Sequence, residues 1–243
     1  MSSRWSLRAS SPQLPKLGME LKINTMDGEL IEVGSSEAAR KVVLLHGLTG
    51  TACAIKPVAE YLLRSLGNAY SFLLPTAPTI RVEQFNGEPV HAWFDVRNCD
   101  FRKEVDVDGI FESSQRIGSM IRMEMARGIS PDDIFLGGFS QGGVIALAAA
   151  LLEPFPVGGV FALSSYLPLE EPLVSRLTDA SKTIPIFLGV SLKDEFISQE
   201  ASGRASSFLV NRGNPVQTNT YDMKHEIRNR EPGSTHDINK KSE

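Results

Sequence analysis

The stretch DDIFLGGFSQGGVIALAAALL, residues 132–152, places one serine between an apolar run and an alanine-rich segment. Residues 134–139 are apolar and partly aromatic, which predicts a short buried strand. Residues 144–152 have the alanine and leucine content of a good helix, and Pro154 ends it. The sequence therefore predicts that Ser140 lies on the turn between a strand and a helix.

Glycines surround this serine in a pattern that is typical of a nucleophile. Gly138, Gly142 and Gly143 match the motif G-x-S-x-G around Ser140, in which missing Cβ atoms allow a sharp turn that exposes the serine oxygen. The N-terminal N–H groups of the following helix would stabilise negative charge beside that oxygen. The alternative interpretation is a glycine-rich turn without special function, because so short a motif often matches by chance.

The composition limits the class of protein. The chain has 243 residues, 42% of them hydrophobic, which is enough for one globular domain with a full core. Its formal net charge is -4 and its lysines and arginines are dispersed, so we expect no nucleic-acid partner. Cys53 and Cys99 form no metal-ligand pattern and no N-x-[ST] sequon occurs, which favours a cytoplasmic protein. No apolar run is long enough for stable membrane insertion.

Segments typical of strands and helices alternate along the chain. We predict strands at 29–33, 41–45, 70–74, 134–139, 157–163, 184–190 and 216–221. We predict helices at 57–66, 107–127, 144–152, 170–178 and 199–211. This alternation predicts an α/β fold with a mostly parallel central sheet and helices on both faces, a three-layer sandwich. We expect a loosely ordered leader at 1–28, one domain at 29–228 and a polar tail at 229–243.

We expect the base that activates the serine to lie in a loop at the carboxyl end of a strand, because active sites of parallel sheets lie at that edge. A serine hydroxyl needs a base within hydrogen-bond reach, and a carboxylate must orient that base. Two histidines lie downstream of Ser140. His225 directly follows the last predicted strand, whereas His236 lies in the polar tail, so we predict His225 as the base.

Three aspartates compete for the role of the acid. Asp194 follows the predicted strand 184–190 and therefore lies at the catalytic end of the sheet. Asp179 precedes that strand, and Asp222 is too close to His225 in sequence to face it from a neighbouring strand. We therefore predict Asp194 as the acid. An isolated aspartate or histidine is usually exposed, but serine, acid and base in this order at strand ends argue for a triad.

Acyl transfer also needs N–H donors for the developing oxyanion. The residue after the nucleophile, Gln141, supplies one, and the loop after the predicted strand 41–45 supplies the other. In that loop we assign Leu48 as the second donor, with Gly47 allowing a close approach of the backbone. His46 precedes the serine in the chain, which argues against it as the base, and we expect it to be structural.

Several motifs occur in the order and spacing of one family. They are HGLTG (46–50), PTAPTIRVEQFNGEPVHAWFDV (75–96), GFSQGG (138–143), ALSSYLPL (162–169), KDEFI (193–197) and YDMKH (221–225). Over residues 29–226 the chain resembles the carboxylesterase and acyl-protein thioesterase family of α/β-hydrolases. The resemblance implies the α/β-hydrolase fold and hydrolysis of carboxylic esters, lysophospholipids or S-acyl thioesters without a cofactor. It implies the same triad, Ser140, Asp194 and His225, and the same oxyanion donors.

The chain departs from the family pattern in several places. Thr49 stands where the family has a glycine beside the oxyanion loop, and Tyr166 replaces a tryptophan. The loop before His225 is one residue shorter than in the family. The C-terminal amphipathic helix of the family has no counterpart in the polar tail, so part of the sheet or of a neighbouring helix should be uncovered. We consider that surface a candidate for a homodimer interface.

The segment 75–94 is the predicted substrate-facing loop, because it leaves the carboxyl end of the strand 70–74. Its aromatic side chains Phe85, Trp93 and Phe94 are predicted to line a groove for the acyl chain. The alternative interpretation is that Trp93 and Phe94 fill the core beneath a long loop.

The sequence thus predicts a serine hydrolase that cleaves carboxylic esters or thioesters through an acyl-enzyme, without metal or cofactor. The substrate would be a small-molecule ester or an acylated protein. One alternative is a catalytically weak or inactive relative that keeps the fold for binding, which Thr49 and the missing helix favour. Another is peptide cleavage by the same triad. The natural acyl donor, its chain length and the oligomeric state stay open at this point.

Overall fold

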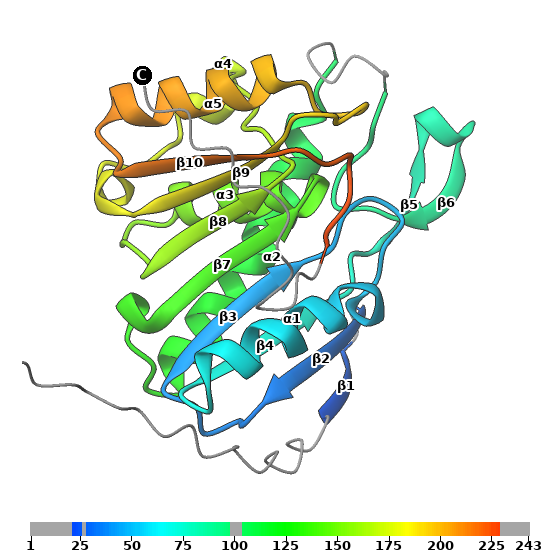
Figure 1. Ribbon diagram of the computed structural model, residues 1–243. Coiled ribbons are helices and arrows are strands. Elements are labelled where there is room, and N and C mark those ends of the chain that lie inside the picture. Colours follow the sequence, from blue (N-terminus) through cyan, green and yellow to red (C-terminus); the bar gives the residue numbers. More distant parts are fainter. Residues whose placement is uncertain (1–20, 26–27, 98–103, 229–243) are drawn as a thin grey trace, which may run out of the picture.

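The computed structural model describes residues 21–25, 28–97 and 104–228 (Figure 1). Within them, the chain forms an eight-stranded sheet in the order β1-β2-β4-β3-β7-β8-β9-β10 and a two-stranded sheet of β5 and β6. The strands are β1 Leu21–Thr25, β2 Gly28–Gly34, β3 Arg40–Leu45, β4 Tyr70–Pro75, β5 Thr79–Val82, β6 Glu88–His91, β7 Ile134–Phe139, β8 Gly159–Leu163, β9 Ile186–Ser191 and β10 Val216–Tyr221. The helices are α1 Ala52–Leu66, α2 Val107–Ala126, α3 Gln141–Leu152, α4 Glu171–Val174 and α5 Gln199–Arg212.

The large sheet is mostly parallel. β3 pairs in parallel with β4 on one side and with β7 on the other, and β8, β9 and β10 continue the parallel order. β1 and β2 are antiparallel to their neighbours. Parallel strands are covered on both faces, which explains why the central strands have nearly continuous apolar sequences. As a result, the loops that follow β3, β7, β9 and β10 open at the same edge of the sheet.

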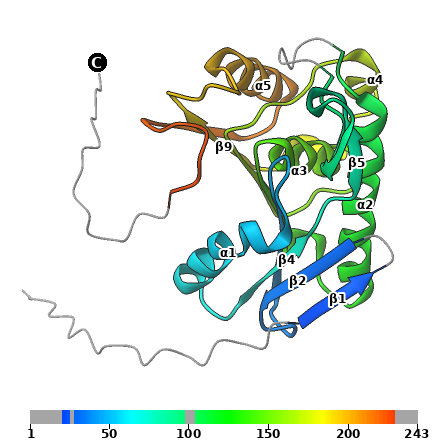
Figure 2. The ribbon, with the colours of Figure 1, turned by 90° about the vertical axis from the view of Figure 1, so that its right-hand side faces the viewer.

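Helices cover both faces of the sheet, which makes three layers (Figures 1 and 2). α1 packs on β2, β3 and β4 on one face. On the other face α3 lies against β7 and β8, and α2 packs on α3. Every residue of α3 from Gln141 to Leu151 is buried, because this helix lies between the sheet and α2. The predicted three-layer α/β sandwich is confirmed.

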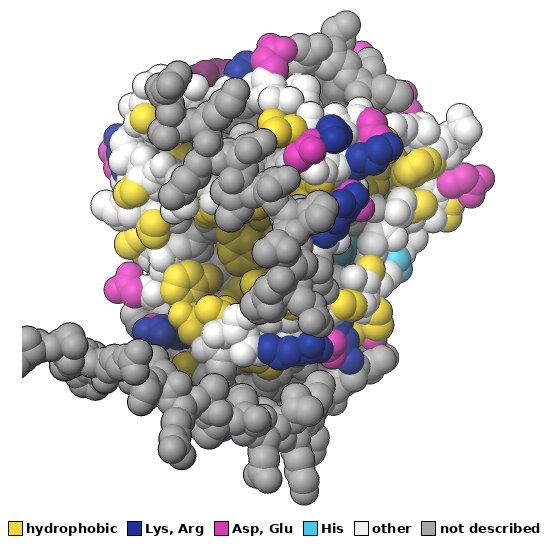
Figure 3. All heavy atoms as spheres, in the orientation of Figure 1, with side chains coloured by type: hydrophobic (Ala, Val, Ile, Leu, Met, Phe, Trp, Pro, Cys, Tyr) yellow, Lys and Arg dark blue, Asp and Glu magenta, His cyan; other side chains and the backbone are white. Residues whose placement is uncertain are grey.

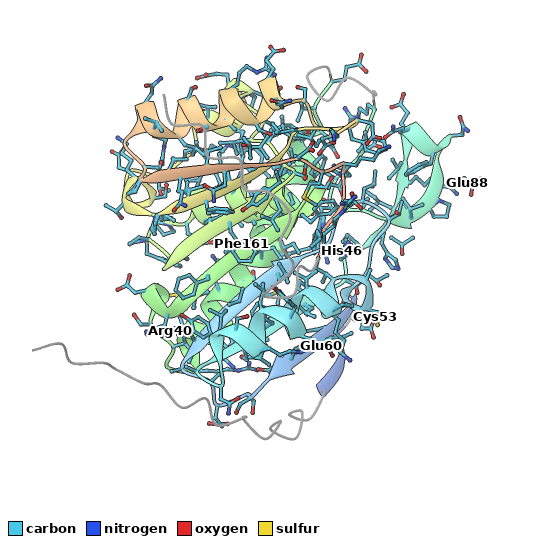
Figure 4. All side chains as sticks on the ribbon, viewed as in Figure 1. Arg40, His46, Cys53, Glu60, Glu88 and Phe161 are labelled. Atoms are coloured by element: carbon cyan, nitrogen blue, oxygen red, sulfur yellow. The ribbon has the colours of Figure 1, made fainter. Side chains whose placement is uncertain are left out.

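Among the described residues, the face that carries α1 is less completely covered by helices than the other face. Phe135 and Phe161, from β7 and β8, are only partly buried and adjoin the apolar cluster beneath α1. Figure 4 shows Phe161 on the sheet away from α1, and Figure 3 shows hydrophobic side chains gathered over the middle of this face. The predicted polar tail, 229–243, lies outside the described residues.

The start of α1 differs from the sequence prediction. The helix begins at Ala52 rather than at Pro57, because Thr51 caps it by accepting a hydrogen bond from the N–H of Ala54 at 3.3 Å. Pro57 lies inside the helix rather than in its first turn. Polar and small residues at its start hide the periodicity on which the sequence prediction depended.

Three further elements correct the sequence prediction. β1 pairs with β2 along Leu21–Thr25, so the predicted leader at 1–28 is wrong for these residues. The helix predicted at 170–178 is reduced to the single turn of α4. The predicted loop 75–94 contains the β5–β6 hairpin, which projects from the carboxyl edge of the parallel strands (Figure 1). In the part of the chain that the structure describes, no helix has the length and apolar character needed to cross a membrane.

Candidate active site

The predicted serine, base and acid meet at the carboxyl edge of the sheet. Ser140 ends β7 and begins α3 with φ 53° and ψ -121°, the backbone of a sharp strand-to-helix turn. Its Oγ lies 2.9 Å from Nε2 of His225, to which the hydroxyl donates. Nδ1 of His225 donates to Oδ2 of Asp194 at 2.8 Å. These two contacts join a hydroxyl, an imidazole and a carboxylate in one hydrogen-bonded line.

The glycines around Ser140 are required by close packing. A Cβ at position 138 would lie 2.3 Å from the backbone of Gly142, so strand and helix could not approach as they do. A Cβ at Gly142 would lie 2.4 Å from the carbonyl oxygen of His46. The motif therefore brings β7, α3 and the loop after β3 together, in addition to forming the turn.

The Asp194 carboxylate is fixed by its own loop. Oδ1 accepts hydrogen bonds from the N–H groups of Phe196 at 2.9 Å and Ile197 at 2.8 Å, which leaves Oδ2 to face His225. The side chain of Asp194 is only 2% exposed. Such a carboxylate is held in one orientation and stays available to fix the tautomer of the imidazole.

The competing aspartates lie elsewhere. Asp179 is exposed and pairs with Lys182 at 2.6 Å. Asp222 is exposed and pairs with Lys193 at 2.8 Å. Neither carboxylate contacts His225, so the geometry brings together only Asp194 of the three.

Two aromatic rings flank His225, and sequence reasoning missed both contacts. Phe139 lies with its ring centroid 4.7 Å from the imidazole, and Phe196 lies at 5.1 Å with an edge-on orientation. Phe196 is 59% exposed, so it forms an apolar part of the rim beside the base. Its position two residues after Asp194 was a signal in the sequence, since an exposed aromatic residue near a candidate triad is a candidate substrate contact.

The two predicted oxyanion donors also lie at this edge. Gln141 is the first residue of α3, and Leu48 lies in the turn after β3. Neither backbone N–H donates to another described residue. A Cβ at Gly47 would lie 3.3 Å from Cβ of Ser140, which shows how closely the Leu48 loop passes the serine. Two free N–H groups beside the serine are suited to a carbonyl oxygen that gains negative charge.

Thr49 occupies a left-handed conformation in this loop. Its φ is 63°, and its N–H donates to the carbonyl of His91 at 2.8 Å. The resemblance gives a glycine here, and a β-branched residue is strained at such an angle. Thr49 therefore holds this turn at a conformational cost.

Thr49→Gly should raise the free energy of unfolding by about 1 kcal/mol, because glycine relieves the strained backbone by more than it adds to the entropy of the unfolded chain. Urea denaturation followed by circular dichroism would measure this change. Thr220→Gly is the matched control, since Thr220 is exposed in β10 and glycine in a strand destabilises. A loss of stability in Thr49→Gly equal to that of the control would contradict the strain.

His46 is buried and hydrogen-bonded through both ring nitrogens. Nδ1 donates to the carbonyl of Gly47 at 2.7 Å, and Nε2 accepts from the N–H of Ala77 at 2.9 Å. Burial lowers the pKa of His46 to about 4 from its ordinary value of 6.5. The ring is therefore neutral near pH 7 and has no contact with Ser140, in agreement with the structural role expected of it.

Acidification should destabilise the fold through His46. The unfolded chain binds a proton near pH 6.5 and the folded chain only near pH 4, so the free energy of unfolding falls as the pH falls through this window. We expect His46 to contribute about 2 to 3 kcal/mol of the loss between pH 7 and pH 4.5. Denaturation of the wild type and of His46→Gln at both pH values would isolate the contribution of His46 to the free energy of unfolding. Equal losses in the two proteins would contradict this prediction.

The predicted acyl-groove residues separate into two groups. Trp93 and Phe94 are only 3% and 4% exposed and belong to the main core, so their assignment as groove residues is corrected. The Trp93 indole Nε1–H donates to the carbonyl of His46 at 2.8 Å, a buried contact that draws the ring inward. Phe85 is partly buried on the β5–β6 hairpin and packs in a small cluster that includes Leu48. Only Phe85 keeps access to the surface.

In the described part of the chain, no three His, Cys, Asp or Glu side chains lie close enough together to hold a metal ion.

Sequence reasoning also missed Ser165, whose hydroxyl donates to the carbonyl of Ser140 at 2.9 Å and supports the strained turn. What the site presents is a serine, its base, an orienting acid and two free N–H groups. This arrangement can carry out acyl transfer.

A parallel sheet with a serine on the strand-to-helix turn, followed in the chain by an aspartate and a histidine, defines an α/β-hydrolase. The family described as phospholipase/carboxylesterase matches residues 26–238, and the chain belongs to it.

Individual relatives agree with this membership. Acyl-protein thioesterase 1 of Kluyveromyces lactis is 37% identical over 180 residues, which cover 72% of this chain and 78% of that protein. Carboxylesterase SOBER1 of Arabidopsis thaliana is 32% identical over 198 residues, covering 79% of this chain and 86% of that protein. The crystal structure of SOBER1 superposes with a TM-score of 0.74 at 29% identity, over 78% of this chain and 91% of that one. The structure of Zea mays acyl-protein thioesterase 2 gives 0.69 at 25% identity, over 83% and 93%.

Proposed function

We propose that this protein is a serine hydrolase that cleaves carboxylic esters or thioesters, with Ser140 as nucleophile, His225 as base and Asp194 as the residue that orients the base. The observation that carries the proposal is the line of two hydrogen bonds, 2.9 Å from Ser140 to His225 and 2.8 Å from His225 to Asp194. Family membership supports it, because relatives are named carboxylesterase and acyl-protein thioesterase.

The reaction follows from this geometry in two halves. His225 Nε2 takes the hydroxyl proton as Oγ of Ser140 attacks the carbonyl carbon, and the carbonyl oxygen gains negative charge facing the N–H groups of Leu48 and Gln141. His225 then gives its proton to the leaving alcohol or thiol, and the acyl group remains on Ser140. In the second half His225 takes a proton from water as the water oxygen attacks the acyl-enzyme. The bond between the acyl carbon and Oγ of Ser140 then breaks, His225 returns the proton to Oγ, and the acid is released.

The substrate class is the finer part of the proposal. An acylated protein and a small ester both present the same acyl carbonyl to Ser140, and the names of the relatives include both classes. We further propose that the enzyme acts in the cytoplasm and that the partly uncovered sheet face around Phe135 and Phe161 supports a homodimer, which sedimentation equilibrium tests. Hydrolysis of matched p-nitrophenyl esters and thioesters of the same acyl group tests the class of leaving group.

Acyl-chain length should matter if the hairpin side of the site binds the chain. Phe85 packs against the same small apolar cluster as Leu48 of the proposed oxyanion loop, so an acyl chain that leaves the carbonyl on this side would contact it. Each buried methylene contributes about 0.8 kcal/mol, so four added carbons should raise kcat/KM by up to roughly two orders of magnitude. Kinetics with acetyl through octanoyl esters would measure this dependence.

Phe85→Ala should flatten the chain-length dependence while short esters keep their rate. Phe208→Ala is the control, because Phe208 is a partly buried aromatic residue on α5, away from the hairpin. If kcat/KM of the wild type stays flat or falls from acetyl to octanoyl esters, the proposed acyl groove is absent. The enzyme would then be a carboxylesterase for small esters.

Two alternatives to an ester or thioester hydrolase can be tested with the same purified protein. A binding protein without activity would leave a fluorophosphonate probe unreacted. Thr49 in the oxyanion loop and the absence of the family's C-terminal helix from the sequence pattern favour this alternative. Peptide cleavage by the same site would appear in a panel of matched esters and amides as comparable rates for both.

A further inference from the structure

A buried side-chain amide connects the nucleophile turn to the segment that follows the β5–β6 hairpin. The side chain of Gln141 is buried, and its Nε2 donates to the carbonyl of Phe94 at 2.7 Å. Its Oε1 accepts from the N–H of Trp93 at 2.9 Å. The amide therefore pairs with the backbone of two adjacent residues. Residue 141 is thus fixed through its side chain while its own N–H remains free.

Trp93 extends this connection to the oxyanion loop. Its indole Nε1–H donates to the carbonyl of His46 at 2.8 Å, and the two rings lie 5.1 Å apart. The ring of His46 is in turn fixed by Gly47 and Ala77. His46 lies at the carboxyl end of β3, next to the loop that contains Leu48 (Figure 4). The Gln141 amide thus bonds to the backbone of Trp93, and the Trp93 indole bonds to the backbone of His46. We name these three residues, linked through side chains and backbone, the oxyanion circuit.

The circuit joins the two segments whose N–H groups must face one oxygen. Leu48 lies in a turn outside any helix or strand, and the next residue has the strained φ of 63°. Strained backbone persists only when its surroundings hold it. The oxyanion circuit holds this turn from the core side, and the carbonyl of His91 holds Thr49 from the hairpin side.

We propose that the side chains of Gln141, Trp93 and His46 are positioning residues that set the separation of the two oxyanion N–H groups, an inference that rests on the proposed function. The circuit touches neither Ser140 Oγ nor His225, so its loss leaves the proton path intact. Its effect is confined to the charge that develops in the transition state. A change of this kind lowers kcat more than it changes KM.

The test uses two variants at different points of the circuit. Trp93→Phe removes the indole donor and keeps an aromatic ring, and Gln141→Met removes both amide contacts while keeping the backbone N–H. Each should lower kcat by about 10- to 100-fold with KM within about twofold, because displaced oxyanion donors lose this much. The affinity for a trifluoromethyl ketone, whose adduct carries the same oxyanion, should fall in parallel. The pH midpoint of the kcat profile should not move.

Controls separate positioning from loss of fold. Ile145→Val shortens a buried side chain of the same helix without touching the circuit and should keep wild-type kcat and inhibitor affinity. The double variant should lose little more than the worse single variant, since a circuit acts as a unit. Trp93→Phe, the milder change, carries the test if Gln141→Met does not fold.

The outcomes distinguish this inference from the proposed function. Wild-type kcat and ketone affinity in both folded variants, with Ser140→Ala inactive, would overturn the oxyanion circuit alone. Activity in Ser140→Ala would overturn the proposed function, whatever the circuit variants do. Parallel losses of kcat and ketone affinity without a shifted pH profile support the circuit.

Discussion

Ser140→Ala should lower turnover of a short-chain ester by about a millionfold, because a triad nucleophile acts as a unit with its base and no other described hydroxyl donates to His225 Nε2. The fold should be unchanged, since the strand-to-helix turn keeps its glycines and alanine needs no new space. Steady-state hydrolysis of a p-nitrophenyl ester, with circular dichroism and thermal unfolding of the same samples, would measure both effects.

Ser206→Ala is the matched control for this prediction. Ser206 lies on α5, where its hydroxyl contacts Thr218 at 3.1 Å and nothing at the active site. It should keep wild-type turnover. Turnover of Ser140→Ala within tenfold of this control would show that another group performs the attack.

His225→Ala should lose about as much activity as Ser140→Ala, because without the imidazole nothing takes the hydroxyl proton. The loss of activity in Asp194→Ala should be roughly a hundredfold smaller, since the base remains and loses only the carboxylate that orients it and stabilises its positive charge. The kcat values of these variants with one ester would establish the order.

Two further substitutions serve as controls for the base and the acid. Asp222→Ala removes the aspartate nearest His225 in sequence, which pairs with Lys193, and should have little effect. His236→Ala should have none, although this histidine lies outside the described residues. A large loss in His236→Ala alone would show that the base has been assigned to the wrong histidine.

The sequence was sufficient to predict the elements that depend on local pattern. The strands at β3, β7 and β10 follow from short apolar or β-branched runs with turn residues at their ends, and their order gives a parallel sheet. The meeting of Ser140, Asp194 and His225 follows from that order alone, because loops at the carboxyl ends of parallel strands converge.

Features that depend on tertiary contacts could not be predicted in this way. Trp93 is drawn into the core by the carbonyl of His46, a partner far away in sequence. The hairpin within 75–94 has no strong alternation of apolar and polar residues, so its pairing of Ile80 with Val90 was not visible. The strain at Thr49 was signalled only by its departure from the family glycine.

The most direct test of the account is the mass of the enzyme during turnover of a slowly released acyl ester, with peptide mapping of the modified residue. We expect the intact protein to gain the mass of one acyl group, on the peptide that contains Ser140. The adduct should be absent from Ser140→Ala and should form far more slowly in His225→Ala. An acyl group found on another residue, or turnover of the ester without any acyl-enzyme, would contradict the proposed mechanism.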